Sequence, residues 1–353
     1  MDSAPTTTAQ WNVKDKKGLD SLIFTPAAPL PKLEPNDVLV KFIAASLNYR
    51  DPLISRGLYP LNVAEGVVPG SDGAGTVVAV GSRVESVKPG DNVITLYHQE
   101  HQGGIVTQRA INSALGGAVD GVLREYGVFP DTGMVPMPPS LTFTEASTLP
   151  CAGLTAWNTL FGLSDMSVKA GDTILTQGTG GVSMFIIQFA LVAGARVIAT
   201  TSTNEKAKGL KSLGVHHVIN YKKDPNWGAT ARGFTPGGEG IDHVAVMSAG
   251  TTMEQALEAV KIGGLISMVG FVGGWAEPSM TRAWFKGCTA RTPICGSKLQ
   301  FEDMCKAIEV NKIKPVVDKK KFELNDLKEA YDYLWDQKHV GKVVISLAQE
   351  EGC

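Results

Sequence analysis

An α/β fold with a doubly wound parallel sheet is predicted for this chain by three observations. The 353 residues suffice for two hydrophobic cores, because domains usually contain roughly 100–200 residues. The residues up to about 150 form short Val and Ile runs interrupted by Gly and Pro, a pattern typical of β structure. From Gly171 onward, short apolar runs alternate with helical segments, and this alternation predicts parallel strands connected by helices.

The β-rich first part is clearest at residues 67–78 and 88–94, where Val and Ile runs follow Pro-Gly pairs. Residues 97–121 contain two Gly-Gly pairs and are long for a connection, so we expect a surface excursion there. In the alternating part, the strand candidates are residues 173–176, 196–200, 218–219, 241–247 and 265–269, and the helix candidates are residues 182–193, 205–213 and 253–260. After about Cys295, the chain returns to mixed character, with helix candidates at residues 301–310 and 324–335 and a strand candidate at residues 342–346.

Composition restricts the classes of partner. The 33 basic and 35 acidic residues give a formal charge of -2, so we expect no nucleic-acid partner and a small-molecule ligand instead. Residues 173–195 carry no charge and are long enough to suggest a membrane span. Because Gly178, Gly180, Gly181 and Gln188 lie within this stretch, we expect a strand, a turn and a buried helix, and no membrane association.

Cysteine usage and the N-terminus indicate a reducing compartment. The five cysteines are scattered and odd in number, which does not suggest a disulfide framework. No basic patch followed by an apolar run is present near Met1, so no secretory signal is expected. Together these features favour a cytoplasmic location.

A glycine-rich segment between a predicted strand and a predicted helix indicates a dinucleotide site. A tight turn and a close approach to a pyrophosphate require glycine, and the pyrophosphate then lies on the free N–H groups of the helix N-terminus. Ser183 replaces the usual third glycine and is small enough for close helix–strand packing. The residues expected to bind the cofactor in this segment are Gly178, Thr179, Gly180, Gly181 and Val182.

The end of the second strand in this region favours NADPH over NADH. NAD-specific sites place an Asp or Glu there to bind the ribose 2′-hydroxyl, but this chain has hydroxyl residues instead. Thr201, Ser202 and Lys206 are suited to hydrogen-bond and neutralise a 2′-phosphate. The alternative is that Ser202 only caps the next helix and that Lys206 is solvated.

The supply of metal ligands predicts no metal site. A catalytic zinc needs about three Cys, His or carboxylate ligands, and a structural zinc needs four ligands that are mostly Cys. All five cysteines lie at or after Cys151, with no C-x-x-C pair. His98 and His101 lie on the expected excursion, where exposed or pocket-lining positions are favoured over a metal role.

With these residues laid out, the chain resembles the medium-chain dehydrogenase/reductase superfamily, in its zinc-independent branch of quinone oxidoreductases and enoyl reductases. The resemblance covers nearly the whole chain and is carried by residues 46–51 (SLNYRD), 69–75 (PGSDGAG), 88–91 (KPGD), 150–157 (PCAGLTAW), 178–183 (GTGGVS) and 339–343 (HVGKV). It implies a GroES-like β-rich catalytic domain formed by both chain ends, with a Rossmann domain inserted. The implied ranges are residues 1–150 and 297–353 for the catalytic domain and residues 151–296 for the NADP(H)-binding domain.

The resemblance also implies where the chemistry takes place. The zinc-ligand positions of related alcohol dehydrogenases correspond to Asn48, Ser71 and Cys151, of which only the last keeps a ligand type. Related enoyl reductases have a tyrosine shortly after an Asn-x-x-Asp segment, which corresponds here to Tyr59. Tyr59 is the preferred proton donor, Tyr49 is the competing phenol, and Asn48 is expected to orient the nicotinamide amide or the substrate oxygen. The alternative is that Tyr59 only packs and that Asn48 only satisfies loop backbone.

Further cofactor contacts follow from the resemblance alone. Lys342 is expected to neutralise pyrophosphate charge, although a surface lysine on an edge strand is the alternative. Tyr221 is expected to stack near the adenine, or else to pack. The remaining implied contacts are Thr155, Ser248, Gly250, Gly270, Phe271 and Val272, and Trp275 is a candidate contact for a bulky apolar substrate.

The function expected from these features is an NADPH-dependent, zinc-free reductase. Its implied acceptor is a carbonyl-conjugated C=C bond or a quinone of a small apolar molecule, in small-molecule or secondary metabolism. The alternatives are a carbonyl or imine reductase, and a low-turnover NADPH-binding structural or sensor protein. The apolar strand at residues 265–269, followed by Phe271 and Val272, is compatible with a homodimer formed by edge-to-edge pairing. The alternative is that this strand is wholly buried within one chain.

Overall fold

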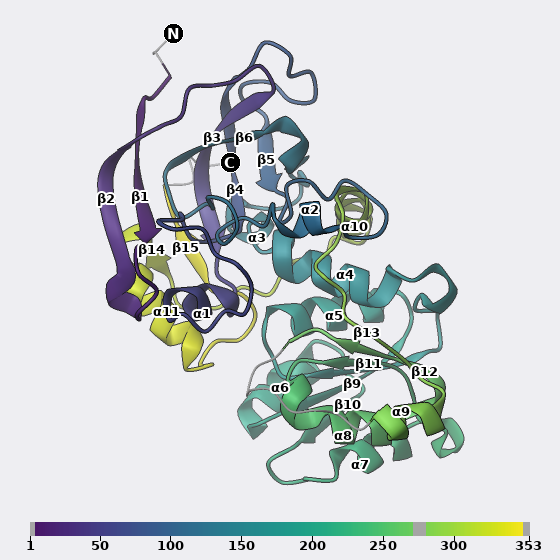
Figure 1. Ribbon diagram of the computed structural model, residues 1–353. Helices are drawn as coiled ribbons and strands as arrows, with labels where there is room; N and C mark the ends of the chain where they lie inside the picture. The colour runs from purple at the N-terminus through teal and green to yellow at the C-terminus, as the bar shows by residue number, and fades with distance from the viewer. Residues whose placement is uncertain (1–3, 271–279, 349–353) are drawn as a thin grey trace. The chain divides into compact units, whose positions relative to one another are not determined.

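The computed structural model describes residues 4–270 and 280–348 and divides into two compact units, which are considered separately (Figure 1). Unit 1 comprises Met1–Leu154 and Gly296–Cys353, and unit 2 comprises Thr155–Cys295. Unit 1 is therefore formed by both ends of the chain.

Unit 1 is built on a seven-stranded, mostly antiparallel sheet in the order β14-β15-β3-β4-β5-β7, with β6 also paired to β3. Only β14 and β15 pair in parallel, and they bring the end of the chain against β3. The strands are β3 (Asp37–Ser46), β4 (Asp72–Val80), β5 (Asn92–Thr95), β6 (Tyr126–Pro130), β7 (Met134–Pro136), β14 (Phe322–Glu323) and β15 (Val344–Ser346).

An antiparallel ribbon and several short helices complete unit 1. The ribbon consists of β1 (Thr7–Val13) and β2 (Leu22–Pro29). Trp11 of β1 is buried, and its indole N–H donates to the carbonyl of Leu324 at 2.8 Å, so residues more than 300 positions apart share one core. The helices are α1 (Arg50–Ser55), α2 (Gln108–Ile111), α3 (Phe143–Ala146), α10 (Lys298–Asn311) and α11 (Leu327–Trp335).

Unit 2 contains the predicted doubly wound sheet. Its six strands pair in parallel in the order β10-β9-β8-β11-β12-β13, which is the strand order of a Rossmann fold. The fold class predicted from the sequence is therefore confirmed. The strands are β8 (Thr173–Gln177), β9 (Arg196–Thr201), β10 (His217–Asn220), β11 (Ile241–Val246), β12 (Val260–Met268) and β13 (Thr289–Arg291).

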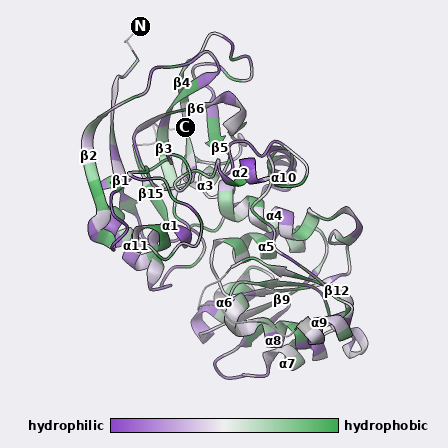
Figure 2. Cartoon of the chain, in the orientation of Figure 1, coloured by the Kyte–Doolittle hydropathy of each residue, from purple (hydrophilic) through white to green (hydrophobic). Residues whose placement is uncertain are grey.

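Helices lie on both faces of this sheet. The helices α7 and α9 both contact α8, and Figure 1 shows α5 on the opposite face. Figure 2 shows hydrophobic residues along α5 and hydrophilic residues along α6, in agreement with the burial of most of α5. The helices of this part of the chain are α4 (Leu154–Phe161), α5 (Gly181–Val192), α6 (Asn204–Ser212), α7 (Trp227–Gly233), α8 (Ala249–Ala259) and α9 (Met280–Lys286).

The structure differs from the sequence-based expectations at one loop and two short elements, and it decides between two alternatives for one strand. Residues 97–121 are not a mere surface excursion, because His98 is 3% exposed and His101 is 5% exposed, and both are buried in unit 1. The helix α7 and the strand β13 were not predicted, since both are short and lack a clear period. For the apolar strand at residues 265–269, the structure agrees with the alternative of burial within one chain, because β12 is paired on both sides, with β11 and β13.

The uncharged stretch at residues 173–195 divides as expected into strand β8, a turn and helix α5. Within the described ranges, no helix combines the length and the apolar character needed to cross a bilayer.

Candidate active site

The turn between β8 and α5 has the geometry that a dinucleotide-binding turn requires. Gly178 has a φ of 77°, a left-handed conformation that glycine adopts without strain, and Gly180 is the N-cap of α5. The hydroxyl of Ser183 donates to the carbonyl of Gln177 at 2.7 Å, so the residue in the third glycine position fastens the first helical turn to the end of the strand. The N-terminal N–H groups of α5 are then held where they can bind an anion.

The end of β9 carries hydroxyl groups, as the sequence indicated. Thr201 is buried, and its carbonyl accepts a hydrogen bond from the N–H of Tyr221 at 3.1 Å. The N-cap of α6 is Thr203, whose hydroxyl accepts from the N–H of Lys206 at 3.2 Å. The alternative in which Ser202 caps this helix is therefore wrong, because the cap lies one residue later. The acidic residue that follows, Glu205, is exposed in the first turn of α6.

Tyr221 follows β10 and is 42% exposed, so it is not a core residue. Its backbone contact with Thr201 places it beside the end of β9, among the groups expected at the 2′-phosphate. The expected stacking of Tyr221 near the adenine stays a prediction.

A glutamine side chain joins the ends of β8 and β11. The Oε1 atom of Gln177 accepts from the N–H of Met247 at 3.1 Å and from the hydroxyl of Thr252 at 3.0 Å. These bonds fix the start of α8, whose N-cap is Ser248 and whose first turn contains Gly250. The carboxyl ends of the two strands at the switch point of the sheet are thus held together.

The remaining unit 2 candidates are placed as follows. Gly270 follows β12, and its carbonyl accepts from the N–H of Ala249 at 3.1 Å. A Cβ atom at Gly270 would lie 2.5 Å from the carbonyl oxygen of Met247, so the close approach requires glycine. Thr155 lies buried in α4, where its carbonyl accepts from the hydroxyl of Thr159 at 2.7 Å. The candidates Phe271, Val272 and Trp275 lie outside the described residues.

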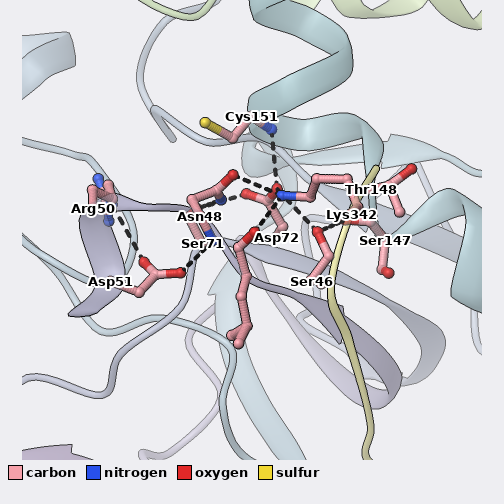
Figure 3. Close-up of polar contacts among 12 residues, drawn as sticks. Ser46, Asn48, Arg50, Asp51, Ser71, Asp72, Ser147, Thr148, Cys151 and Lys342 are labelled. Atoms are coloured by element: carbon pink, nitrogen blue, oxygen red, sulfur yellow. Dashed lines mark hydrogen bonds and ion pairs between the residues drawn. The ribbon is translucent and has the colours of Figure 1, made fainter. Parts of the chain in front are cut away.

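In unit 1, the end of the chain supplies a buried ammonium group to a polar cluster (Figure 3). The Nζ atom of Lys342 donates to the carbonyl of Leu47 at 2.7 Å, to Oδ1 of Asn48 at 2.7 Å and to Oδ2 of Asp72 at 3.2 Å. The side chain of Lys342 is 4% exposed, and that of Asp72 is fully buried. Buried charges need such partners, because leaving either of them alone would cost several kcal/mol.

The structure gives Lys342 partners other than the pyrophosphate expected from the resemblance. All three of its ammonium hydrogens are used by acceptors within unit 1, so no hydrogen remains for the pyrophosphate expected to bind there. The alternative of a surface lysine is wrong as well, because the side chain is buried.

Asp72 is the centre of the cluster. Its Oδ1 atom accepts from the hydroxyl of Ser71 at 2.6 Å, and its Oδ2 atom accepts from the hydroxyl of Ser46 and from the N–H of Cys151, both at 3.3 Å. The amide Nδ2 of Asn48 donates to the Ser71 hydroxyl at 3.3 Å. Asn48, Ser71 and Cys151 are therefore brought together around one carboxylate, as Figure 3 shows.

This donor set does not fit a catalytic zinc. An amide, a hydroxyl and one thiol replace the thiolate, imidazole and carboxylate ligands that such an ion needs. The cluster also already contains the cation of Lys342. No group of three or more His, Cys, Asp or Glu side chains with metal-binding geometry occurs in the described part of the chain.

A buried arginine lies beside this cluster. The guanidinium of Arg50 donates to the hydroxyl of Tyr97 and to the carbonyl of Leu115, and its Nε lies 3.6 Å from Oδ1 of Asp51. Burial raises the pKa of Asp51 to about 6, although Arg50 and the N–H of Asn48 oppose the shift. The other oxygen of Asp51 accepts from this N–H at 2.8 Å and so fixes the backbone of Asn48.

The two candidate phenols have different surroundings. Tyr59 is half-buried and lines a cavity of about 300 Å³, and its ring centroid lies 5.8 Å from the guanidinium carbon of Arg50. Tyr49 stacks on Trp335, with ring centroids 5.5 Å apart and an interplanar angle of 9°. Burial raises the pKa of Tyr49 above its ordinary value, although Arg56 opposes the shift. The cavity is lined by Arg50, Tyr59, Leu61, Asn62, Gln108, Ile111, Asn112, Ala114, Gly117 and Ala118.

No role was predicted for Asp72 or Arg50 from the sequence, although both belong to the motifs that carry the family resemblance. Asp72 is a charged residue between the small residues Ser71 and Gly73, and a charge buried in such a segment requires a partner. Arg50 is followed by a residue of opposite charge, Asp51, and both are buried. That signal was present, but the identity of the partners was not, because Asp72 and Lys342 are 270 residues apart.

Comparison with known proteins identifies the family. The alcohol dehydrogenase GroES-like domain matches residues 34–139, and the zinc-binding dehydrogenase domain matches residues 181–310. A zinc-type alcohol dehydrogenase-like protein of Schizosaccharomyces pombe is 46% identical over 321 residues, covering 90% of this chain and 92% of its own length. The chain belongs to the medium-chain dehydrogenase/reductase superfamily of oxidoreductases.

Other members of the superfamily are similar along most of the chain. A 2-methylene-furan-3-one reductase of Solanum lycopersicum is 31% identical, covering 97% of this chain and 80% of its own length. A protein of Sinorhizobium meliloti 1021 described as a candidate alcohol dehydrogenase has a crystal structure with a TM-score of 0.89 and 34% identity, covering 98% of this chain and all of its own. The resemblance predicted from the sequence motifs is therefore confirmed at the level of the superfamily.

Proposed function

We propose that this medium-chain oxidoreductase uses NADPH, without zinc, to reduce a carbonyl-conjugated C=C bond or a quinone of a small apolar molecule. The observation that carries the proposal is the cluster around Asn48, which offers hydrogen-bond donors where a zinc enzyme needs metal ligands. Without a Lewis acid, an alcohol substrate lacks the group that stabilises its alkoxide. Hydrogen-bond donors suffice for an enolate, whose negative charge is spread over a conjugated system.

The residues of unit 2 fit a phosphorylated dinucleotide. Gly178 and the N-terminus of α5 suit the pyrophosphate, and the hydroxyl of Ser202 together with Lys206 suits a 2′-phosphate. A carboxylate at the end of β9 would repel this phosphate, and none is present at residues 200–204. When bound, NADPH supplies a hydride to the electrophilic carbon of the substrate.

The residues of unit 1 have separate tasks in this reaction. As the β-carbon gains a hydride, negative charge collects on the carbonyl oxygen, and an amide N–H of Asn48 stabilises it. The α-carbon then takes a proton, for which the phenol of Tyr59 is the donor at the wall of the 300 Å³ cavity. Tyr49 is less suited to this task, because its ring is stacked on Trp335. The Solanum relative is named as a reductase of 2-methylene-furan-3-one, in which a C=C bond is conjugated to a carbonyl.

The test follows the label from NADPH deuterated at C4 into the products of a panel of enones, quinones, aldehydes and imines. Deuterium at the β-carbon of an enone, or NADPH-dependent formation of a hydroquinol, supports the proposal. Label on a carbonyl or imine carbon would replace the proposal with carbonyl or imine reduction. Tight NADPH binding without consumption would instead favour a binding protein or sensor. Equal dissociation constants for NADPH and NADH would contradict the cofactor assignment.

A further inference from the structure

Asn48 and three other side chains, those of Ser71, Asp72 and Lys342, close a ring of hydrogen bonds (Figure 3). Lys342 donates to Oδ1 of Asn48 at 2.7 Å, and Nδ2 of Asn48 donates to the hydroxyl of Ser71 at 3.3 Å. The Ser71 hydroxyl donates to Oδ1 of Asp72 at 2.6 Å, and Oδ2 of Asp72 accepts from Lys342 at 3.2 Å. Ser71, Asp72 and Lys342 are all at least 96% buried.

The direction of every bond in this ring is fixed by chemistry. An ammonium group has donors only and an ionised carboxylate has acceptors only, so Lys342 must face the oxygen of the Asn48 amide. The amide nitrogen therefore faces Ser71, whose own hydrogen is committed to Asp72. The usual ambiguity between the oxygen and the nitrogen of an asparagine side chain is removed.

One N–H group of the Asn48 amide is not used within this ring. An amide nitrogen carries two hydrogens, and Nδ2 of Asn48 uses one of them on Ser71. The second has no acceptor among the residues that the structure describes, and the Asn48 side chain is only half-buried. The adjacent ammonium withdraws electron density from the amide and so strengthens this donor.

We propose that Lys342 is a positioning residue, which holds the Asn48 amide so that its second Nδ2 hydrogen binds the substrate oxygen that becomes negative. The inference rests on the proposed function, because it concerns the enolate of that reaction. It assigns Lys342 to the substrate through Asn48 and not to the cofactor phosphates. The backbone of Asn48 is held independently by Asp51, so changing the side-chain partners of Asn48 releases its amide group but leaves its backbone in place.

The first variant removes the donor itself. Asn48→Ala is expected to lower kcat on an enone by about 100-fold, the usual effect of losing one oxyanion donor, because the interaction is made mainly in the transition state. The dissociation constant for NADPH is expected to stay within about twofold of the wild-type value, a change below about 0.4 kcal/mol.

The second variant removes the positioning charge without leaving its partner charged. Lys342→Met combined with Asp72→Asn keeps a neutral cluster but no longer forces the direction of the amide. We expect kcat to fall about tenfold, with KM for the enone and the dissociation constant for NADPH unchanged. Lys342→Arg retains a buried cation and should recover part of kcat. Lys320→Met removes an exposed lysine that pairs with Glu329, and it is the matched control with wild-type turnover.

A binding measurement gives a readout that does not depend on turnover. With NADP⁺ present, para-nitrophenolate mimics an enolate, and it should bind the wild type about tenfold more tightly than Asn48→Ala. A loss of NADPH affinity with unchanged kcat in the Lys342 variants would assign Lys342 to the cofactor and overturn the inference. Wild-type turnover in Asn48→Ala would overturn it too. If the wild type reduces no enone or quinone, the proposed function is contradicted, and so is the inference that depends on it.

Discussion

The ammonium nitrogen of Lys342 lies 3.2 Å from Oδ2 of Asp72, and both side chains are almost wholly removed from water. The two residues come from the two separate chain segments of unit 1, because Asp72 begins β4 and Lys342 precedes β15. The strand β3 pairs with both β4 and β15 and so brings the two side chains together. The pair therefore joins the C-terminal segment to the polar cluster as well as orienting Asn48.

Breaking this ion pair should lower the stability of the protein strongly, and neutralising the remaining partner should largely restore it. Lys342→Met should lower the free energy of unfolding by about 3–5 kcal/mol, because it leaves the Asp72 carboxylate buried without a counter-ion. Adding Asp72→Asn to the same variant should restore most of that loss. Urea unfolding of the two variants and the wild type measures the difference.

The exposed pair of Lys320 and Glu329 is the control for the buried pair. Their nitrogen and oxygen atoms are 2.7 Å apart, but the two side chains are 43% and 64% exposed. Lys320→Met should therefore cost less than about 1 kcal/mol. An equal loss in Lys320→Met and Lys342→Met would show that burial of the pair is not what matters.

The sequence predicted the parallel sheet of unit 2 well, because that sheet is organised by local signals. Each strand is a short apolar run, each helix begins near a polar or glycine residue, and right-handed crossovers limit the strand order. The turn at Gly178 could be predicted because a tight turn between a strand and a helix requires glycine residues in this pattern. The short helix α7 and the short strand β13 carry too few residues for a period to be recognised.

The polar cluster of unit 1 was less predictable, since its members are far apart in the chain. Asn48 was singled out through the family motif, but nothing in the sequence pairs it with Lys342, which is 294 residues away. His98 and His101 were misplaced for a related reason. Their segment is rich in glycine like a surface loop, yet the chain folds it back so that Leu115 and Tyr97 pair across it and both imidazoles are buried.

A negative charge at Ser202 should reverse the cofactor preference. Ser202→Asp places a carboxylate at the end of β9, where it repels a 2′-phosphate but can accept from a free ribose hydroxyl. The dissociation constant for NADPH should rise about tenfold or more, while that for NADH should stay level or fall. Ser212→Asp, at the other end of α6, adds the same charge and is the control. Equal weakening by both substitutions would mean that net charge alone determines the affinity.

Replacing the two candidate phenols should give unequal results. Tyr59→Phe removes the hydroxyl at the cavity wall and should lower turnover on an enone by about 100-fold, in the range typical of a lost general acid. The affinity for NADPH should not change, because Tyr59 lies in unit 1 and the dinucleotide turn in unit 2. Tyr49→Phe keeps the stack on Trp335 and should leave turnover near the wild-type value. The opposite ranking of the two variants would make Tyr49 the proton donor.

The buried imidazole of His98 should make stability fall as the solution becomes acidic. Burial, together with the positive charge of Arg50 and the neighbouring His101, lowers the pKa of His98 from 6.5 to about 3. Between these two pH values the unfolded chain binds a proton that the folded chain does not, so the free energy of unfolding decreases as the pH falls. One such group contributes about 1.4 kcal/mol for each pH unit within this window.

Urea unfolding at pH 7 and pH 5 tests this contribution. The wild type should lose about 2 kcal/mol more than His98→Gln over the interval, because glutamine has no proton to gain. His217→Gln, at a half-buried position in unit 2 where burial also lowers the pKa of the imidazole, is the control and should show a smaller difference. If the wild type and His98→Gln lose the same stability, His98 is protonated in the folded protein. Its imidazole would then need a negatively charged partner that none of its described neighbours provides, since Arg50, Tyr97 and His101 are cationic or neutral.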